Sequence, residues 1–123
     1  LLSNEASPQQ ASQAGYNFYA DFHAFKFSPS SNCVADVWNK GYQVITIIND
    51  LLRVKSENFN DKIKLFAGLK TIRAYTYLTL LNYYGNIMMV PETAATITTP
   101  LSNTNNQQII AHIDTDLSTA NTV

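Results

Sequence analysis

The feature that most limits the possible folds is a pair of long segments in which apolar residues recur every three or four positions. This spacing is typical of a helix with one apolar face. In residues 34–55 the apolar stripe consists of Val34, Trp38, Tyr42, Ile45 and Leu52. Val37, Val44, Ile48 and Leu51 border that stripe. So wide an apolar arc predicts a helix that packs against two neighbours.

The second long segment, residues 62–84, has the same periodicity. Its stripe consists of Phe66, Leu69, Arg73, Tyr77, Leu80 and Tyr84. The residues alongside that stripe are Leu65, Ile72 and Leu81. Gly85 follows directly and predicts a left-handed stop at the carboxyl end of the helix. A short polar connection, residues 56–61, joins the two segments and suits antiparallel helices.

Two further helices are predicted at either side of this pair. Ser7 and Pro8 form a typical helix start, and the apolar residues of 7–26 then follow at helical spacing: Ala11, Ala14, Phe18, Phe22 and Phe25. Thr104 or Asn105 is expected to cap a last helix containing Ile109, Ile110, Ile113, Leu117 and Ala120. The long connection 86–103 has little strand alternation. The sequence therefore predicts an all-α fold of about four helices.

Composition narrows the class of protein. The 123 residues suit one domain, and 46% are hydrophobic, so the low charged fraction of 14% does not indicate disorder. A net charge of −1 argues against a nucleic-acid surface, which needs clustered Lys and Arg. A single cysteine, Cys33, excludes an intrachain disulfide and a cysteine zinc cluster. The last residues, 120–123, contain no Gly or Pro to end the helix, so we expect the chain to be part of a larger protein.

No arrangement of residues predicts an enzyme, a metal site or a cofactor. His23 and His112 are the only histidines, and only His112 has a suitable partner, Asp116, four residues later on the same helix face. Such pairs are far more often surface pairs than sites. Asp114 and Asp116 lie two residues apart, hence on different faces, so they do not form a catalytic dyad. A helix start at Cys33 would lower the pKa of its thiol, but nothing else makes it a nucleophile.

Two polar residues, Asn49 and Arg73, interrupt the apolar stripes. A buried amide needs hydrogen bonds and a buried guanidinium needs a counter-charge. The functional interpretation is that they contact a ligand. The structural interpretation, which we favour, is that they bind loop carbonyls or a carboxylate such as Asp116 between adjacent helices.

Aromatic residues outside the stripes are candidate platforms for a sugar ring, since an aromatic ring offers a flat apolar face. Phe27, Phe59 and Tyr83 are the candidates for ligand binding, because they lie in loops or at a helix end. Tyr42, Tyr77 and Tyr84 are at core spacing and are expected to pack inside.

The ordered motifs resemble the SusD/RagB family of outer-membrane nutrient-binding lipoproteins. The first is Trp38-x3-Tyr42-x2-Ile45-x3-Asn49-x2-Leu52, and the second is Ile72-Arg73-Ala74-Tyr75-x-Tyr77-x2-Leu80-x2-Tyr83-Tyr84-Gly85-Asn86-Ile87. Pro91-Glu92-Thr93 and Ile109-x3-Ile113-x2-Asp116-Leu117-x2-Ala120 are similar to the family's next segments in the same order. The start of the chain, from Ser7 to Tyr16, also resembles the family's opening helix. The resemblance thus covers almost the whole chain.

The resemblance implies tetratricopeptide-like helix pairs, with residues 1–123 forming a single helical region at the amino-terminal end of a larger SusD-like domain. It implies a surface-exposed protein of the outer membrane, held by a lipid anchor outside this chain. Such a protein binds oligosaccharides or other nutrients, works with a SusC-like TonB-dependent transporter, has no cofactor and is not an enzyme. The alternative is a helical scaffold that docks a transporter, with no small-molecule site in this segment.

The chain departs from the family pattern at two places. Met88 occupies the position where the family usually has a proline, and the loop from Phe27 to Cys33 is shorter than in many relatives. Because the family's glycan sites lie mostly in variable loops, no ligand-binding residue can be carried over to this chain.

Overall fold

A computed structural model describes residues 25, 31–53, 63–92 and 101–122 of this chain, with only the backbone of Asn32 and Cys33. The described elements are three α-helices: α2 from Asn32 to Arg53, α3 from Ile63 to Tyr84 and α4 from Asn106 to Asn121. These residues contain no strand, so the predicted all-α class is confirmed for the described part of the chain. The helix predicted over 7–26 lies outside the described residues.

The helix ends follow the local signals in the sequence. The Ser31 carbonyl accepts the amides of Val34 and Ala35 at the start of α2. Gly85 has φ +72°, the left-handed conformation expected at the end of α3. Of the two predicted caps for α4, Asn105 is the one used, and its side-chain oxygen accepts the Gln107 amide at 2.8 Å. Observed and predicted boundaries therefore agree to within about two residues.

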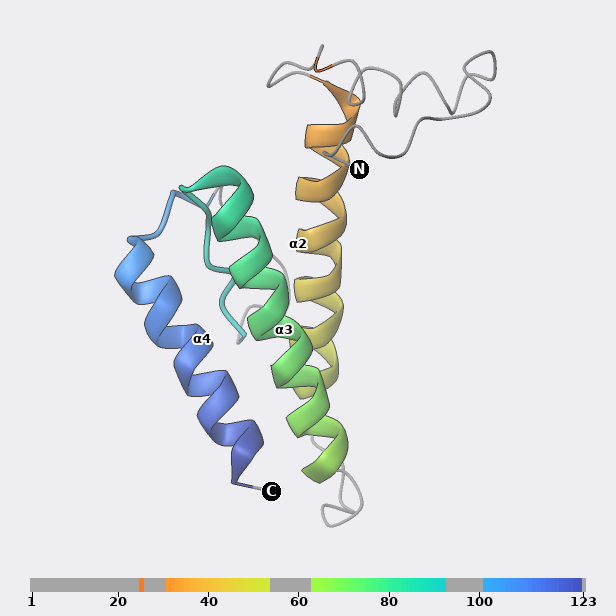
Figure 1. The fold of residues 1–123 in the computed structure, drawn as a ribbon. Helices are drawn as coiled ribbons and strands as arrows, with labels where there is room; N and C mark the ends of the chain where they lie inside the picture. Colours follow the sequence, from red (N-terminus) through yellow and green to blue (C-terminus); the bar gives the residue numbers. More distant parts are fainter. Residues whose placement is uncertain (1–24, 26–30, 54–62, 93–100, 123) are drawn as a thin grey trace. The chain divides into compact units, whose positions relative to one another are not determined.

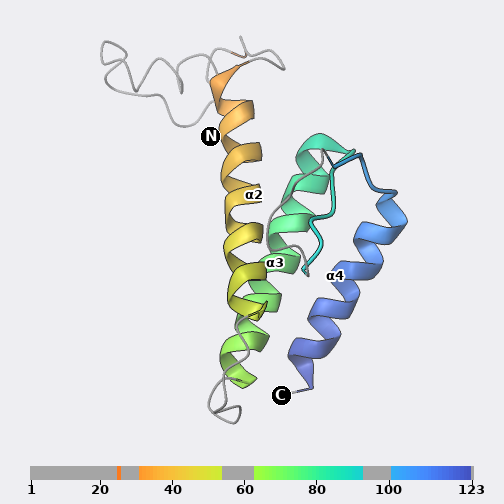
Figure 2. The same ribbon diagram turned by 180° about the vertical axis from the view of Figure 1, so that it is seen from behind.

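The chain divides into two units, residues 1–39 and 40–123, with the boundary inside α2. In the second unit, α3 lies between α4 and the part of α2 that begins at Lys40, as both views show (Figures 1 and 2). The core of this unit takes residues from all three helices and from the segment after Gly85: Ile45, Ile48, Ala74, Tyr77, Leu80, Ile87, Val90, Ile109 and Ile113.

Five apolar residues that border the two predicted stripes are instead exposed to solvent: Val37, Val44, Leu51, Leu65 and Ile72. The reason is that α3 carries apolar residues all round and α2 over a wide arc, so periodicity cannot identify the side that becomes buried. The side of α2 that carries Ile45 faces the core, and so does the side of α3 that carries Arg73 and Tyr77.

None of the described helices is long and apolar enough to cross a membrane.

Candidate functional site

Arg73 is the centre of the candidate site. Its side chain is only 1% exposed, in the middle of α3. The guanidinium binds the Asp116 carboxylate of α4 through two parallel hydrogen bonds, from Nε to Oδ2 and from Nη2 to Oδ1, both 2.7 Å long. Asp116 is equally buried, at 2% exposed. This two-point geometry is the strongest form of an arginine–carboxylate pair, and it joins α3 to α4.

The third guanidinium nitrogen joins Arg73 to two other parts of the chain. Nη1 donates to Asn49 Oδ1 of α2 at 2.6 Å and to Glu92 Oε2 at 2.9 Å. Asn49 in turn donates its amide to the Val90 carbonyl at 3.3 Å. Glu92 is partly exposed, so it lies between Arg73 and solvent. One arginine therefore connects α2, α3, α4 and the segment that follows α3.

That segment, Ile87 to Glu92, has no strand partner, and side chains bind its backbone instead. The Tyr42 hydroxyl donates to the Met88 carbonyl at 2.9 Å and accepts the Met88 amide at 2.7 Å. The Tyr77 hydroxyl accepts the Val90 amide at 3.0 Å. Thr104 contributes two more bonds, since its hydroxyl accepts the Met89 amide and its own amide donates to the Ile87 carbonyl. These bonds supply the partners that buried backbone groups require.

Met88 uses an amide hydrogen that a proline at this position would lack. A proline here would lose that one bond but would keep the bond from the Tyr42 hydroxyl to the carbonyl of residue 88. Tyr42 and Met88 lie 46 residues apart in the sequence, so the contact also brings α2 to the segment after α3.

The side chains of Arg73, Asp116, Asn49 and Glu92 form what we call the Arg73 network. His112 lies beside this network, on α4. Its Nε2 lies 3.7 Å from Asp116 Oδ2, and its ring meets the Tyr77 ring edge-on with centroids 5.6 Å apart. Burial lowers the pKa of His112, although the Asp116 charge acts in the opposite direction. The imidazole is therefore neutral at pH 7, and Arg73 provides the positive charge that Asp116 requires.

Burial also affects the other ionisable groups here. It raises the pKa of Tyr77 to about 12 and raises that of Tyr42 as well, so both hydroxyls stay protonated and keep their bonds to the segment. For Arg73, burial acts to lower the pKa, but the Asp116 and Glu92 carboxylates outweigh it and the pKa is raised. Arg73 is consequently a fixed cation held by two carboxylates.

The predicted motif residues fall mostly in this network or beside it. Tyr42, Asn49, Arg73 and Tyr77 make the bonds described above, Ala74 is buried next to Arg73, and Gly85 ends α3. Tyr84 is half-buried, and Trp38 belongs to the other unit of the chain. The contact expected between Arg73 and Asp116 is present.

The remaining predictions had mixed outcomes. The assignment of His112 and Asp116 as a surface pair was wrong, because Asp116 is buried and bound by Arg73. Among the sugar-platform candidates Tyr83 is exposed, whereas Phe27 and Phe59 lie outside the described residues. The sequence analysis names Thr104 only as a possible helix cap and Glu92 only within a motif, and it predicts neither of their contacts, because both lie in a non-helical connection without periodicity.

The chemistry of this arrangement is that of a structural tie. All five N–H groups of a guanidinium point in fixed directions, and here at least four make bonds to Asp116, Asn49 and Glu92. Within the described residues, every buried side-chain nitrogen and oxygen has a partner, and no group of three or more His, Cys, Asp or Glu residues could hold a metal ion. Comparisons of the chain with protein-family models, with curated proteins and with solved structures find no match.

Proposed function

We propose that this chain is a SusD/RagB-like helical region that takes part in nutrient binding at the outer-membrane surface. It acts by binding, not by catalysis, alongside a TonB-dependent transporter. The observation that carries the proposal is the convergence of the motif residues. Tyr42, Asn49, Arg73 and Tyr77 are spread over 36 positions of the sequence, and they meet around one segment, 87–92.

This convergence supports the resemblance because it gives the shared motif a physical role. In the helix that contains the Arg–Ala–Tyr motif, the side chains of Arg73 and Tyr77 bind the non-helical segment between α3 and α4. Gly85 ends this helix and begins the change of direction. The tetratricopeptide-like repeat is the finer part of the proposal. The helices α3 and α4, joined through Arg73 and Asp116, would be one of its helix pairs.

The nutrient in this proposal is a neutral oligosaccharide. The support is the composition, in which charged residues are scarce at 14% and aromatic residues reach 11%. An uncharged surface with aromatic side chains suits sugar rings, which bind by stacking and neutral hydrogen bonds. Isothermal titration of the protein against a panel of neutral oligosaccharides tests this part. We expect heat of binding with at least one of them, and silence across the whole panel would remove the glycan claim.

The location and the partner require a separate experiment. Antibody labelling of intact native cells should detect the protein at the surface, and a TonB-dependent transporter should co-purify with it from native outer membranes. A protein found in the cytoplasm would refute the location, whatever the titration showed.

The alternative function is a helical scaffold that docks the transporter and has no small-molecule site in this segment. The exposed apolar residues of α2 and α3 favour it, because contiguous apolar surface often marks a protein interface. Substitution of Tyr83 by alanine separates the two: a scaffold keeps any sugar binding of the whole protein unchanged, whereas a stacking role for Tyr83 predicts weaker binding.

A further inference from the structure

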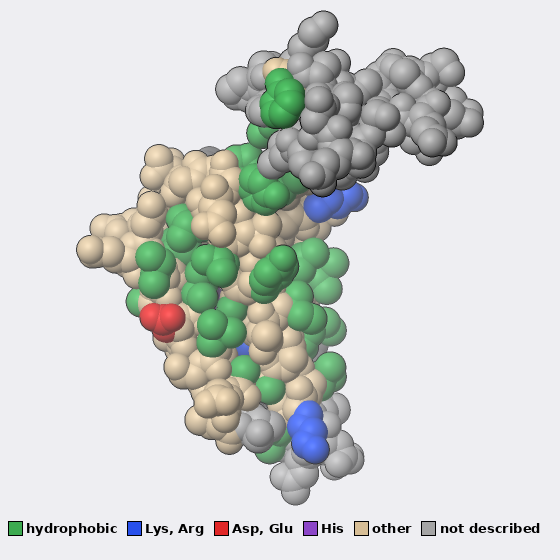
Figure 3. Space-filling model, viewed as in Figure 1, with side chains coloured by type: hydrophobic (Ala, Val, Ile, Leu, Met, Phe, Trp, Pro, Cys, Tyr) green, Lys and Arg blue, Asp and Glu red, His purple; other side chains and the backbone are tan. Residues whose placement is uncertain are grey.

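One face of α3 is apolar and open to solvent. Its large residues are Leu65, Ile72, Tyr75 and Tyr83, which are between 51% and 70% exposed. At 100° per residue Tyr75 lies about 160° around the helix from Arg73, and Leu65, Ile72 and Tyr83 lie about 80–100° from it, so the face is turned away from the Arg73 side chain without being directly opposite to it. Figure 3 shows hydrophobic side chains gathered over α3.

Two threonines of α3 bond their hydroxyls to the backbone of their own helix. The Thr79 hydroxyl donates to the Tyr75 carbonyl at 2.8 Å, and the Thr71 hydroxyl donates to the Ala67 carbonyl at 2.9 Å. Because these hydroxyls are bonded to their own helix, they do not need water as a partner. The face is consequently more apolar than its sequence indicates.

The helix α2 extends the apolar area beside α3. A Cβ atom added to Gly41 would lie 2.8 Å from the Leu80 side chain, which marks the side of α2 that approaches α3. Val44 and Leu51 follow on nearly the same side of α2, with Ile47 next to them, and all three are exposed. They border the α3 face on its outer side.

The area of this surface matches the requirement of a stable dimer. With about 60–120 Å² for a free aliphatic side chain and about 150–250 Å² for a tyrosine, these residues of α2 and α3 expose about 500 Å² of apolar surface. A standard interface buries about 800 Å² on each partner, of which about 60% is apolar. The apolar surface needed on each partner is therefore also about 500 Å².

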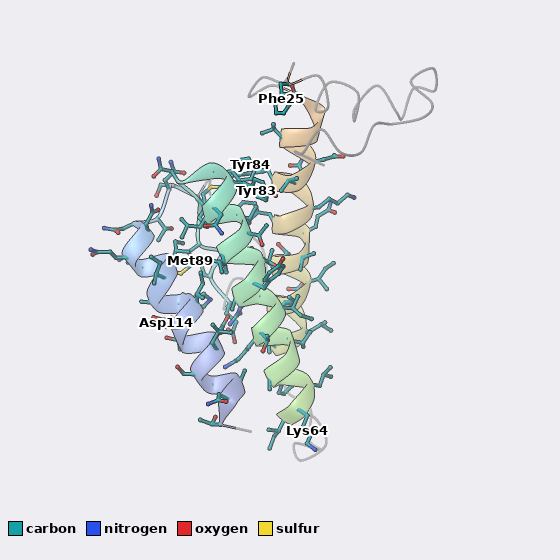
Figure 4. The ribbon with its side chains drawn as sticks, viewed as in Figure 1. Phe25, Lys64, Tyr83, Tyr84, Met89 and Asp114 are labelled. Carbon is teal, nitrogen blue, oxygen red and sulfur yellow. The ribbon has the colours of Figure 1, made fainter. Side chains whose placement is uncertain are left out.

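An antiparallel pairing of two α3 helices places residues at equal distances from its centre opposite one another. About a midpoint between Ile72 and Tyr75, Gly68 is as far from the centre as Thr79, and Lys64 is as far as Tyr83. Figure 4 shows Lys64 and Tyr83 toward opposite ends of α3. A two-fold axis requires this kind of match, since the same surface must fit itself.

We propose that two copies of this chain pair through α3, with their α3 helices antiparallel about a two-fold axis near Ile72 and Tyr75. Each Ile72 then packs against Tyr75 of the second copy. Each Gly68 lies opposite Thr79 of the second copy, and nothing within 4 Å of the Gly68 Cβ position obstructs the approach.

The charges of α3 suit this arrangement. The helix contains no Asp or Glu, so the pairing buries no carboxylate of α3. At each end Lys64 reaches Tyr83 of the second copy, where the ammonium group can lie over the aromatic ring. The net charge of −1 leaves little long-range repulsion between two copies. This pairing does not depend on the nutrient-binding proposal, and it gives Tyr83 a role other than sugar stacking.

Sedimentation equilibrium of the full chain over a wide concentration range tests the pairing. We expect a reversible dimer, and Tyr75→Lys should raise the dimer dissociation constant at least about 30-fold by placing a charge at the centre of the interface. The matched control is Ile110→Lys, an exposed apolar residue of α4, which should change the constant less than about twofold. Circular dichroism of each variant verifies that it is folded.

A cross-linking experiment tests the antiparallel register. In a Cys33→Ser background, Gly68→Cys and Thr79→Cys variants are prepared separately, mixed and treated with a short bismaleimide. The mixture should give a covalent dimer that contains one copy of each variant. Cross-linking of either variant with itself but not with the other would overturn the register. A monomer at all concentrations, or a dimer that Tyr75→Lys leaves intact, would overturn the pairing.

Discussion

At the scale of single residues, Arg73 holds more of the fold than any other described side chain. It binds Asp116, Asn49 and Glu92, which come from three different parts of the chain. Its burial makes these bonds interdependent, because removal of the cation leaves the Asp116 carboxylate buried without its counter-charge. The net value of such a pair is modest, but the cost of breaking it is large.

Arg73→Ala should lower the free energy of unfolding by about 3–5 kcal/mol, the usual cost of leaving one partner of a buried pair. Urea denaturation monitored by circular dichroism measures this loss. The matched control is Arg53→Ala, which removes an exposed i,i+3 pair with Asp50 and should cost less than about 1 kcal/mol. If the two variants were equally stable, the Arg73 network would have no structural role.

The glycines of α2 and α3 provide a second comparison. Gly68 lies in an exposed part of α3 with nothing near its Cβ position, so Gly68→Ala should raise the free energy of unfolding by about 1 kcal/mol. Gly41→Ala gains the same helix propensity, but its methyl group would come within 2.8 Å of the Leu80 side chain. Overpacking costs about 1–3 kcal/mol, so this variant should be less stable than Gly68→Ala. Thermal unfolding measures the stability of both variants. An equal increase in stability in the two would contradict the close approach of α2 to α3.

At the scale of elements, the segment 87–92 is unusual because side chains replace a strand partner. Tyr42, Tyr77 and Thr104 bind its backbone amides, and Asn49 binds the Val90 carbonyl. Since each bond comes from a different place in the fold, the segment can be ordered only when α2, α3 and the start of α4 are in position. A change in the packing of these helices should therefore also change the structure of the segment.

Tyr77→Phe keeps the ring but leaves the Val90 amide buried without an acceptor, so it should cost about 1–3 kcal/mol. Amide hydrogen exchange should show a loss of protection at Val90. Tyr42→Phe should do the same at Met88, whose amide the Tyr42 hydroxyl accepts. Tyr75→Phe is the control, because Tyr75 is the most exposed of the tyrosines in α3 and binds none of these amides. Unchanged exchange at Val90 in Tyr77→Phe would mean that the hydroxyl is not its acceptor in solution.

The helices could be predicted from the sequence because their signals are local. Gly85 stops α3 by its own conformation, and Asn105 caps α4 by bonding an amide two residues away. The buried tie of Arg73 could also be predicted, since a cation on an apolar stripe requires a partner. The sequence left loop carbonyls and a carboxylate such as Asp116 as possible partners, and the structure shows that Arg73 binds Asp116.

The rest depends on contacts between distant positions. The bond from Tyr42 to Met88 spans 46 residues, and no local pattern encodes it. Glu92 follows a proline in a connection without periodicity, so nothing in the sequence indicates that it reaches Arg73. The exposed side of α3 could not be identified, because apolar residues occur all round the helix and only the positions of α2 and α4 decide which of them are covered.

At the scale of the whole molecule, the Arg73 network lies beside a histidine, the residue type whose ordinary pKa is closest to neutral pH. His112 faces Asp116 on its own helix, Arg73, Lys70 and Tyr77 from α3, and Glu92 from the following segment. Burial lowers the pKa of His112 in the folded protein, and this effect exceeds the attraction of Asp116. In the unfolded chain the same group has a pKa near about 6.5.

The sign of the pH dependence follows from that difference. As the pH falls through about 6.5, the unfolded chain binds a proton at His112 before the folded protein does. The free energy of unfolding should therefore decrease as the pH falls through this range. Below the lowered pKa of His112 in the folded protein, the imidazole is protonated in both states. The contribution of His112 to the pH dependence of the free energy of unfolding therefore ends there. Above about pH 7.5 the imidazole is neutral in both states and contributes no pH dependence.

Urea denaturation at about pH 7.5 and at about pH 5.5 measures this loss, and the variant His112→Asn isolates it. Asparagine keeps a polar side chain beside Asp116 but cannot take up a proton in this range, so the variant should lose less stability than the wild type between the two pH values. His23 is present in both proteins and cancels in the difference. If wild type and variant lost equal stability on acidification, His112 would not be the group that links the Arg73 network to pH. A greater loss in the variant would mean that protonated His112 stabilises the fold through Asp116, which is the reverse of the expected sign.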